Sequence, residues 1–356
     1  MKTTKQNRKN TSPQPLDSRL PELLLPWYAQ NARALPWRAD REPYHVWISE
    51  IMLQQTRVET VTGYYTRFLF HLPDIQALSE VEEEKLLKLW EGLGYYSRAR
   101  NLQKAARLIM QKYSGVFPSA YEEIRALPGI GDYTAGAVSS ICFEEPRPAV
   151  DGNVLRVYAR LTASEEPVDL PAAKKRITTE LAALYPAGRC GDFTQSLMEL
   201  GATVCVPRSP RCGECPVRAL CAADQRKIAE KLPVKTPKKG KREEQRTVFF
   251  FQCGDKIALC KRSGRGLLSG LWQLPDVTGA LSVNEALAKA EVLGVCPTAI
   301  RSEMHREHIF THIRWEMVCY GINCGAMPDS YTWVAREEIE QSYALPTAYR
   351  QFFTES

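Results

Sequence analysis

The sequence "ALPGIGDYTAGAV", residues 126–138, places two glycines one residue apart between an apolar segment and a run of helix-forming residues. Gly129 and Gly131 allow positive φ angles and a close approach of the backbone to a ligand. The N–H groups that open the next helix point outward and can bind an anion. The pattern predicts a helical hairpin that grips a phosphate group, although an ordinary pair of helices joined by a glycine turn also explains these residues.

The composition indicates a multidomain protein. A chain of 356 residues with 44% hydrophobic content can form two or three cores. The first twenty residues are basic and polar and lack the apolar stretch of a signal peptide, so we expect a cytoplasmic protein without a membrane span. The net charge is +6, and residues 225–246 hold nine Lys or Arg against three Asp or Glu, so the excess is local. Such a segment suits a polyanion, but a solvated linker has the same composition.

The chain divides into a helical part and a mixed part. Residues 17–221 are expected to be mostly helical, and in "SEVEEEKLLKLWEGLG" (79–94) Ser79 and Glu82 form a potential capping box. The Pro- and Lys-rich stretch at 230–246 predicts a domain boundary. Strand-like segments follow, namely "RTVFFFQCGDKIALCKR", "RWEMVCYGI" and "YTWVAR", so the last third is expected to be α+β.

Four closely spaced cysteines predict a metal centre. Cys205, Cys212, Cys215 and Cys221 have the spacing C-x6-C-x2-C-x5-C, and the total of eleven cysteines is odd, which argues against a disulfide framework. Zinc sites more often join two separate C-x2-C pairs, whereas here one compact loop holds all four thiols. An iron–sulfur cluster is therefore favoured over zinc.

The segment "PYHVWISEIMLQQT" (43–56) predicts a helix that begins at Pro43 and has apolar side chains around most of its circumference. Glu50 is therefore expected to be enclosed. An enclosed carboxyl group favours its protonated form, which a general acid needs near neutral pH. The alternative is a Glu50 on a narrow exposed strip, hydrogen-bonded to Gln54 or Arg57.

A second acid has the opposite expected state. In "DGNVLRVYARLT" (151–162) Asp151 is placed to cap a helix, and a carboxylate that accepts backbone N–H bonds stays ionised. Capping alone would also explain this residue. One protonated and one ionised acid form the pair that cleaves glycosidic bonds.

Together these motifs resemble the adenine DNA glycosylases of the MutY type, within the helix-hairpin-helix superfamily shared with endonuclease III. The similarity covers residues 16–353 and is carried by "LPWR", "WISEIMLQQTRVETV", "WEGLGYYSRARNL", "LPGIGDYTAGAV", "AVDGNVLRV", the thiol loop and "EHIFTH". It implies a disordered tail (1–15) and an all-α helix-hairpin-helix glycosylase region (16–223). A basic linker (224–246) and an α+β Nudix-like domain (247–353) would follow. Within the glycosylase region a six-helix barrel would span 36–142, and an iron–sulfur lobe would combine 16–35 with 143–223.

The resemblance also implies an activity, the removal of adenine opposite 8-oxoguanine or guanine in duplex DNA by a base-excision-repair hydrolase, and we expect a monomer. Adenine would be flipped into a pocket, where Glu50 protonates it at N7. Asp151 would stabilise the oxocarbenium-like sugar, with Tyr133 and Asn153 hydrogen-bonding around it. Bifunctional relatives carry a Schiff-base lysine at the position of Tyr133, and a phenol cannot form that bond, so a monofunctional enzyme is expected. An endonuclease III-like lyase and a non-enzymatic DNA-binding protein are the competing interpretations.

Further roles follow from family position. A [4Fe-4S] cluster would be held by Cys205, Cys212, Cys215 and Cys221. The DNA backbone would be bound by Gly129 and Gly131, and the gap in the duplex would be filled by Gln55 and Tyr95. The adenine pocket would consist of Arg33, Leu35, Trp37, Arg38, Leu53 and Gln195. Recognition of 8-oxoguanine would fall to His308, Phe310, Thr311 and His312. Family members carry Glu or Gln at the position of Gln195, and many have serine in place of Thr311. The Nudix-like helix has only Glu285 and Glu291, so magnesium-dependent hydrolysis is not expected.

Overall fold

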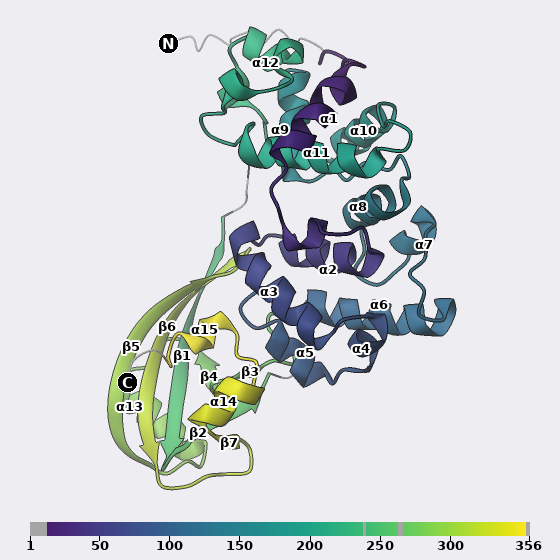
Figure 1. Ribbon diagram of the computed structural model, residues 1–356. Helices are drawn as coiled ribbons and strands as arrows, with labels where there is room; N and C mark the ends of the chain where they lie inside the picture. Colours follow the sequence, from purple (N-terminus) through teal and green to yellow (C-terminus); the bar gives the residue numbers. More distant parts are fainter. Residues whose placement is uncertain (1–12, 238–239, 263–265, 354–356) are drawn as a thin grey trace, which may run out of the picture. The chain divides into compact units, whose positions relative to one another are not determined.

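The protein consists of two compact units in a computed structural model that describes residues 13–237, 240–262 and 266–353. One unit combines Met1–Ser79 with Lys104–Pro237, and the other combines Glu80–Gln103 with Lys238–Ser356. The first is helical and the second is built around a sheet (Figure 1). Most of the tail predicted at 1–15 lies outside the described residues. None of the helices in the described part of the chain has the length and apolar character to cross a membrane.

The helical unit is made of short helices and turns. Its α-helices are α1 (Leu20–Asn31), α2 (Pro43–Leu53), α3 (Val58–His71), α4 (Ile75–Glu80), α7 (Tyr121–Arg125), α8 (Asp132–Phe143), α9 (Gly152–Leu161), α10 (Pro171–Ala182), α11 (Cys190–Thr203) and α12 (Ala222–Gln225). Its 3-10 turns are η1 (Pro36–Arg38), η2 (Cys212–Glu214), η3 (Arg218–Leu220) and η4 (Ala229–Lys231). Helix α6 (Ser97–Tyr113) begins in the other unit and continues into this one.

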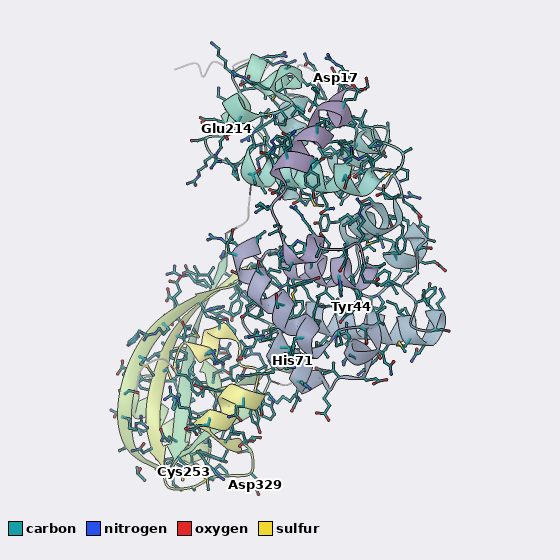
Figure 2. The ribbon with its side chains drawn as sticks, in the orientation of Figure 1. Asp17, Tyr44, His71, Glu214, Cys253 and Asp329 are labelled. Atoms are coloured by element: carbon teal, nitrogen blue, oxygen red, sulfur yellow. The ribbon has the colours of Figure 1, made fainter. Side chains whose placement is uncertain are left out.

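Helix α2 is the centre of one helical core. It packs against α3 and α8, and its Val46, Trp47 and Ile48 are almost completely buried. The Tyr44 hydroxyl donates a hydrogen bond of 2.8 Å to the Leu72 carbonyl, one residue beyond the end of α3 (Tyr44 and His71 are labelled in Figure 2). Because α2 buries side chains on almost every side, a polar residue in this helix is forced into the interior.

A second core joins α1, α9, α10 and α11 to the loop that carries the four thiols. Leu24, Val157, Tyr158 and Phe193 belong to it, and Cys205, Cys215 and Cys221 pack against it. The thiol loop thus packs against α9, the helix that Asp151 precedes.

The predicted helical hairpin is present as α7, a turn and α8. Gly129 has a φ of +78°, which favours glycine, but Gly131 is extended, with a φ of −100°, and forms the N-cap of α8. Of the two glycines that allow positive φ, Gly129 alone adopts it. Only the first turn residue needs the left-handed region.

The predicted capping box at Ser79 is also wrong. Ser79 lies in the last turn of α4, where its hydroxyl donates to the Gln76 carbonyl at 2.8 Å. The next helix, α5 (Glu83–Leu89), starts from Glu82 without a side-chain cap. Asp74 caps the earlier helix by accepting the Ala77 N–H, so the stretch forms two helices where one was expected.

The basic segment expected as a linker over 224–246 is largely structured. Leu232 is buried, and the Val168 N–H donates to the Val234 carbonyl at 3.1 Å, so residues up to Pro237 belong to the helical unit. Strand β1 (Arg242–Cys253) already begins within the same segment. Composition alone overestimated the length of the linker, because apolar residues such as Leu232 and Val234 are few among many charged residues.

The second unit is built around a mixed sheet with the strand order β3-β2-β1-β6-β5. Its strands are β1, β2 (Lys256–Lys261), β3 (Trp272–Gln273), β4 (Asp276–Thr278), β5 (Pro297–Ile309), β6 (Ile313–Cys324) and β7 (Thr332–Ala335). The helices are α5, the start of α6, α13 (Val283–Val292), α14 (Arg336–Ser342) and α15 (Thr347–Arg350). Strands β1 and β6 are parallel, and β5 pairs antiparallel with β6.

Both faces of this sheet are covered. Along β1, Val248 faces a core that includes Ile339 of α14 and Tyr349 of α15, whereas Phe249 faces a core that includes Ala286 of α13. The alternation of side chains along one strand supplies both cores, as the period of a strand requires. The α+β expectation for the last third is confirmed.

Gly201 offers a test of the packing between α9 and α11. A Cβ at this position would lie 2.6 Å from the Asn153 Cβ and 3.1 Å from its Cα. We expect Gly201→Ala to lower the free energy of unfolding by about 1–3 kcal/mol, because the helices must separate to admit the methyl group. Gly63→Ala in α3 is the control, since open space surrounds that position. Denaturant unfolding should leave the control unchanged or up to about 1 kcal/mol more stable. Equal stability of both variants would contradict the close approach.

Candidate active site

The carboxyl group of Glu50 is enclosed, as the sequence predicted. Glu50 is 6% exposed, and its neighbours on α2 from Val46 to Met52 are buried as well. The alternative of a narrow exposed strip is therefore wrong. The Tyr133 hydroxyl, from the first turn of α8, donates a hydrogen bond of 2.5 Å to Glu50 Oε2. The hairpin and α2 thus meet at this carboxyl group.

The surroundings of Glu50 favour its protonated form. Burial raises the pKa of Glu50 to about 7, against a smaller lowering effect of the Tyr133 hydrogen bond. The negative charge of Asp151 raises this pKa further and the positive charge of Arg38 lowers it. Burial also raises the pKa of Tyr133 well above its ordinary value, so the phenol keeps its proton and remains a donor. Near neutral pH the pair can therefore hold a proton ready for transfer.

Asp151 is the N-cap of α9, as predicted. Its Oδ1 accepts the Val154 N–H at 2.8 Å and its Oδ2 accepts the Asn153 side-chain amide at 2.8 Å. Burial raises the pKa of Asp151, an effect that capping alone did not predict, while the hydrogen bonds from Val154 and Asn153 oppose it. These bonds are therefore what favours the ionised form of this acid.

A buried arginine connects Asp151 to the thiol loop. The Arg156 guanidinium donates to Asn153 Oδ1 at 2.8 Å, and its Nε donates to the Cys205 carbonyl at 2.7 Å. Asn153 in turn donates to Asp151, so one chain of hydrogen bonds runs from the acid to the backbone of the first thiol residue. The capping acid and the thiol loop are thus connected through Asn153 and Arg156.

These groups line one cavity of about 680 Å³ within the helical unit. The predicted site residues that line it are Arg33, Leu35, Trp37, Arg38, Glu50, Leu53, Gln55, Tyr133, Asp151, Asn153 and Gln195. The size is in the range of pockets that enclose small organic ligands. Gly129 and Gly131 lie outside this lining, on the hairpin turn, and Tyr95, His308, Phe310, Thr311 and His312 lie in the second unit.

Comparisons with known proteins match three segments of the chain to known families. Residues 48–185 match the HhH-GPD superfamily of base excision DNA repair proteins, residues 205–221 match the iron–sulfur binding domain of endonuclease III, and residues 247–355 match a NUDIX domain. The chain is 35% identical to the adenine DNA glycosylase of Homo sapiens, over 93% of this chain and 72% of the human one. It is 39% identical to that of Arabidopsis thaliana, over 82% of this chain and 55% of the plant protein.

The chain belongs to the adenine DNA glycosylase family. It is a DNA glycosylase, a hydrolase of N-glycosyl bonds that removes adenine in base excision repair. Among solved structures, a thermostable thymine-DNA glycosylase is similar, with a TM-score of 0.53 and 30% identity over 59% of this chain and 95% of that one. Endonuclease III in a non-covalent DNA complex has a TM-score of 0.51 at 25% identity, over 60% of this chain and 99% of that one.

In this glycosylase the thiol loop holds an iron–sulfur cluster, and the alternative of zinc is set aside. All four predicted thiols line one small pocket together with Arg160, so the donor set suits a group bound by thiolates. No three His, Cys, Asp or Glu side chains in the described ranges, these thiols included, are close enough to bind one metal ion. Arg160 is buried, and its guanidinium donates to Cys205 Sγ at 3.2 Å, an interaction that stabilises a thiolate.

The second unit of the glycosylase joins Tyr95 to the predicted recognition loop. Tyr95 precedes α6, and its hydroxyl lies 2.5 Å from the Thr311 hydroxyl. Lys241 Nζ donates to the Phe310 carbonyl at 2.9 Å, and the Phe310 ring lies against His308, with 4.5 Å between the ring centroids. Sequence reasoning placed both parts at the DNA but did not foresee the contact between them.

The Nudix-like helix is α13. Its Glu285 is engaged in a capping box with Ser282, accepting bonds from the Ser282 N–H and hydroxyl. One of the two available glutamates is therefore occupied in stabilising the helix start.

Sequence reasoning missed Glu199 of α11. This side chain is completely buried at the cavity wall, and it pairs with Arg33 and Arg38. A signal was present, because Glu199 follows Gln195 by four residues and therefore shares its face of the helix. Lys174 of α10 also lines the cavity and was likewise not considered.

The raised pKa of Glu50 predicts that the difference in free energy of unfolding between the wild type and Glu50→Gln changes with pH. Below pH 4.5 the carboxyl group is protonated in the folded and unfolded chains alike; between 4.5 and about 7 only the folded chain keeps the proton. Above pH 7 folding must therefore bury a charge. As the pH rises through this window, the free energy of unfolding of the wild type falls by up to about 3 kcal/mol relative to that of Glu50→Gln. Denaturant unfolding at pH 4.5 and 8 measures the effect. A constant difference between the two proteins would contradict the raised pKa.

Proposed function

We propose that this glycosylase removes adenine opposite 8-oxoguanine or guanine and leaves the DNA backbone intact. The observation that carries the proposal is the single cavity in which a proton-bearing acid, Glu50, and a capped acid, Asp151, face the same space. Glu50 protonates the flipped adenine at N7, which turns the base into a neutral leaving group. Asp151 stabilises the positive charge that develops on the sugar, held by Asn153 and the Val154 N–H.

The absence of a Schiff base rests on Tyr133. This phenol occupies the position of the lysine of bifunctional relatives and is committed to Glu50 by its hydrogen bond. Lys174 is the rival nucleophile, because it lines the same cavity. Its side chain is exposed to solvent, whereas Tyr133 is enclosed beside Glu50.

Recognition of the opposite base is assigned to the second unit. Tyr95 is 46% exposed and has a φ of +45°, and Gln55, in the cavity lining, has a φ of +61°. Non-glycine residues in this strained region often serve a ligand. The pair of hydroxyl groups at Tyr95 and Thr311 offers donors and acceptors to an oxidised guanine, and threonine keeps the hydroxyl of the more common serine. His312 follows directly in the same loop.

The cofactor proposal is a [4Fe-4S] cluster held by Cys205, Cys212, Cys215 and Cys221. Bound there, it would fix the loop by four iron–thiolate bonds. The residues of this chain then carry that rigidity to Asp151 through Arg156 and Asn153. The DNA-bound enzyme acts as a monomer in this proposal.

The test is excision from duplexes with adenine opposite 8-oxoguanine, guanine or thymine. We expect removal opposite 8-oxoguanine to be fastest, removal opposite thymine to be absent, and strand breaks to appear only after hot alkali. Glu50→Gln should abolish excision in single turnover, while Glu22→Gln, an exposed acid of α1, should not.

Two results would contradict the proposal. Strand scission without alkali, or an enzyme–DNA adduct trapped by borohydride, would indicate a lyase, and loss of the adduct in Lys174→Ala would identify the nucleophile. Equal excision opposite 8-oxoguanine and thymine would exclude recognition of the opposite base.

A further inference from the structure

We infer that Glu199 is a positioning residue that holds the Arg33 and Arg38 guanidinium groups in the cavity wall and keeps the charge of Arg38 away from Glu50. The inference rests on the proposed role of Glu50 as the acid. It adds a third carboxyl group to the site, one that contacts neither the base nor the sugar in the proposed mechanism.

Both carboxylate oxygens of Glu199 are occupied. Its Oε1 accepts from Arg33 Nε at 2.6 Å and from the Arg33 backbone N–H at 3.2 Å. Its Oε2 accepts from Arg33 Nη2 at 3.0 Å and from Arg38 Nη2 at 2.8 Å. Arg38 Nη1 also donates to the Arg33 carbonyl at 3.2 Å. One acid of α11 thereby holds Arg33, which precedes η1, and Arg38, the last residue of η1.

The burial of the three side chains shows which charge depends most on Glu199. The side chain of Glu199 is 0% exposed, that of Arg38 is 15% exposed and that of Arg33 is 35% exposed. Burial alone would raise the pKa of Glu199, but hydrogen bonds from the two arginines lower it below its ordinary value, so it is an anion. Water can screen Arg33, whereas Arg38 relies on this anion for compensation.

Arg38 can act on Glu50. Its positive charge already lowers the pKa of that carboxyl group, although it is engaged with Glu199 and lies over the Tyr28 ring, 5.7 Å from the centroid. Without the anion, the guanidinium keeps its charge and loses its strongest partner. The cavity that Arg38 lines also contains the carboxyl groups of Glu50, Asp151 and Asp40, so a guanidinium released from Glu199 acts on them more strongly.

The other titratable and charged groups near Glu50 and the two arginines come from several elements. Helix α8 contributes Tyr133 and Cys142, and Asp151 belongs to the N-cap of α9. From α3, Glu59 acts on Arg33, and Tyr65 packs edge-on against Trp37 of η1. Glu199 is the anion that pairs with both arginines, so removing it shifts the charge balance of the cavity toward Arg33 and Arg38.

The experiment is the pH profile of single-turnover adenine excision. In the wild type the rate should fall with rising pH as Glu50 loses its proton. In Glu199→Gln this alkaline limb should move to lower pH by about one unit or more, because an unpaired cation favours the carboxylate. Glu199→Asp keeps the anion and should restore the position of the limb, even if the rate is reduced.

Arg38→Gln supplies the opposite test and does not depend on the folding of Glu199→Gln. It removes the cation and leaves Glu199 paired with Arg33, so the limb should move to higher pH. The double variant Glu199→Gln/Arg38→Gln should lose the shift toward low pH.

The outcomes separate the inference from the proposed function. If the wild type shows the alkaline limb of the pH profile and Glu199→Gln has lower rates at every pH but an unmoved limb, Glu199 has only a structural role. That result would overturn the inference and leave the proposed function intact. An unmoved limb in Arg38→Gln would do the same. A wild type without any alkaline limb would remove the proposed acid, and the inference with it.

Discussion

The hydrogen bond from Tyr133 to the buried carboxyl group of Glu50 is the contact on which the site depends. It joins the first turn of α8 to the middle of α2, and it lies where burial raises the pKa of the acid to about 7. A charged carboxylate here would lack the solvation that water gives it, so the apolar surroundings of α2 decide the protonation state. The apolar side chains of α2 that form the core thus also set the protonation state of Glu50.

Three buried acids in the helical unit are handled in three ways. Glu50 is left with a phenol and keeps a proton, Asp151 receives a backbone N–H and an amide, and Glu199 receives two arginines. The environment of each sets its charge, because the residue types are chemically almost identical. In the proposed mechanism this arrangement separates a proton donor from an anion within one cavity, as bond cleavage at a sugar requires.

Much of this could be predicted from local sequence. Glu50 was predicted to be buried because apolar residues surround it on α2, and Asp151 was predicted to cap because it precedes an amphipathic helix. Glu199 was missed because its partners lie more than 160 residues away, and no local pattern reports such a pairing. The same limit explains why Glu80–Gln103 was not expected to cluster with the C-terminal unit, where Tyr95 meets Thr311. Ser79 failed as a cap because Asp74 started an earlier helix.

Infrared difference titration of the wild type against Glu50→Gln measures the protonation of this one carboxyl group directly. The carbonyl stretch of the protonated acid should disappear with a midpoint near pH 7. A midpoint near 4.5, the ordinary value for glutamate, would contradict the central claim that burial keeps a transferable proton on Glu50.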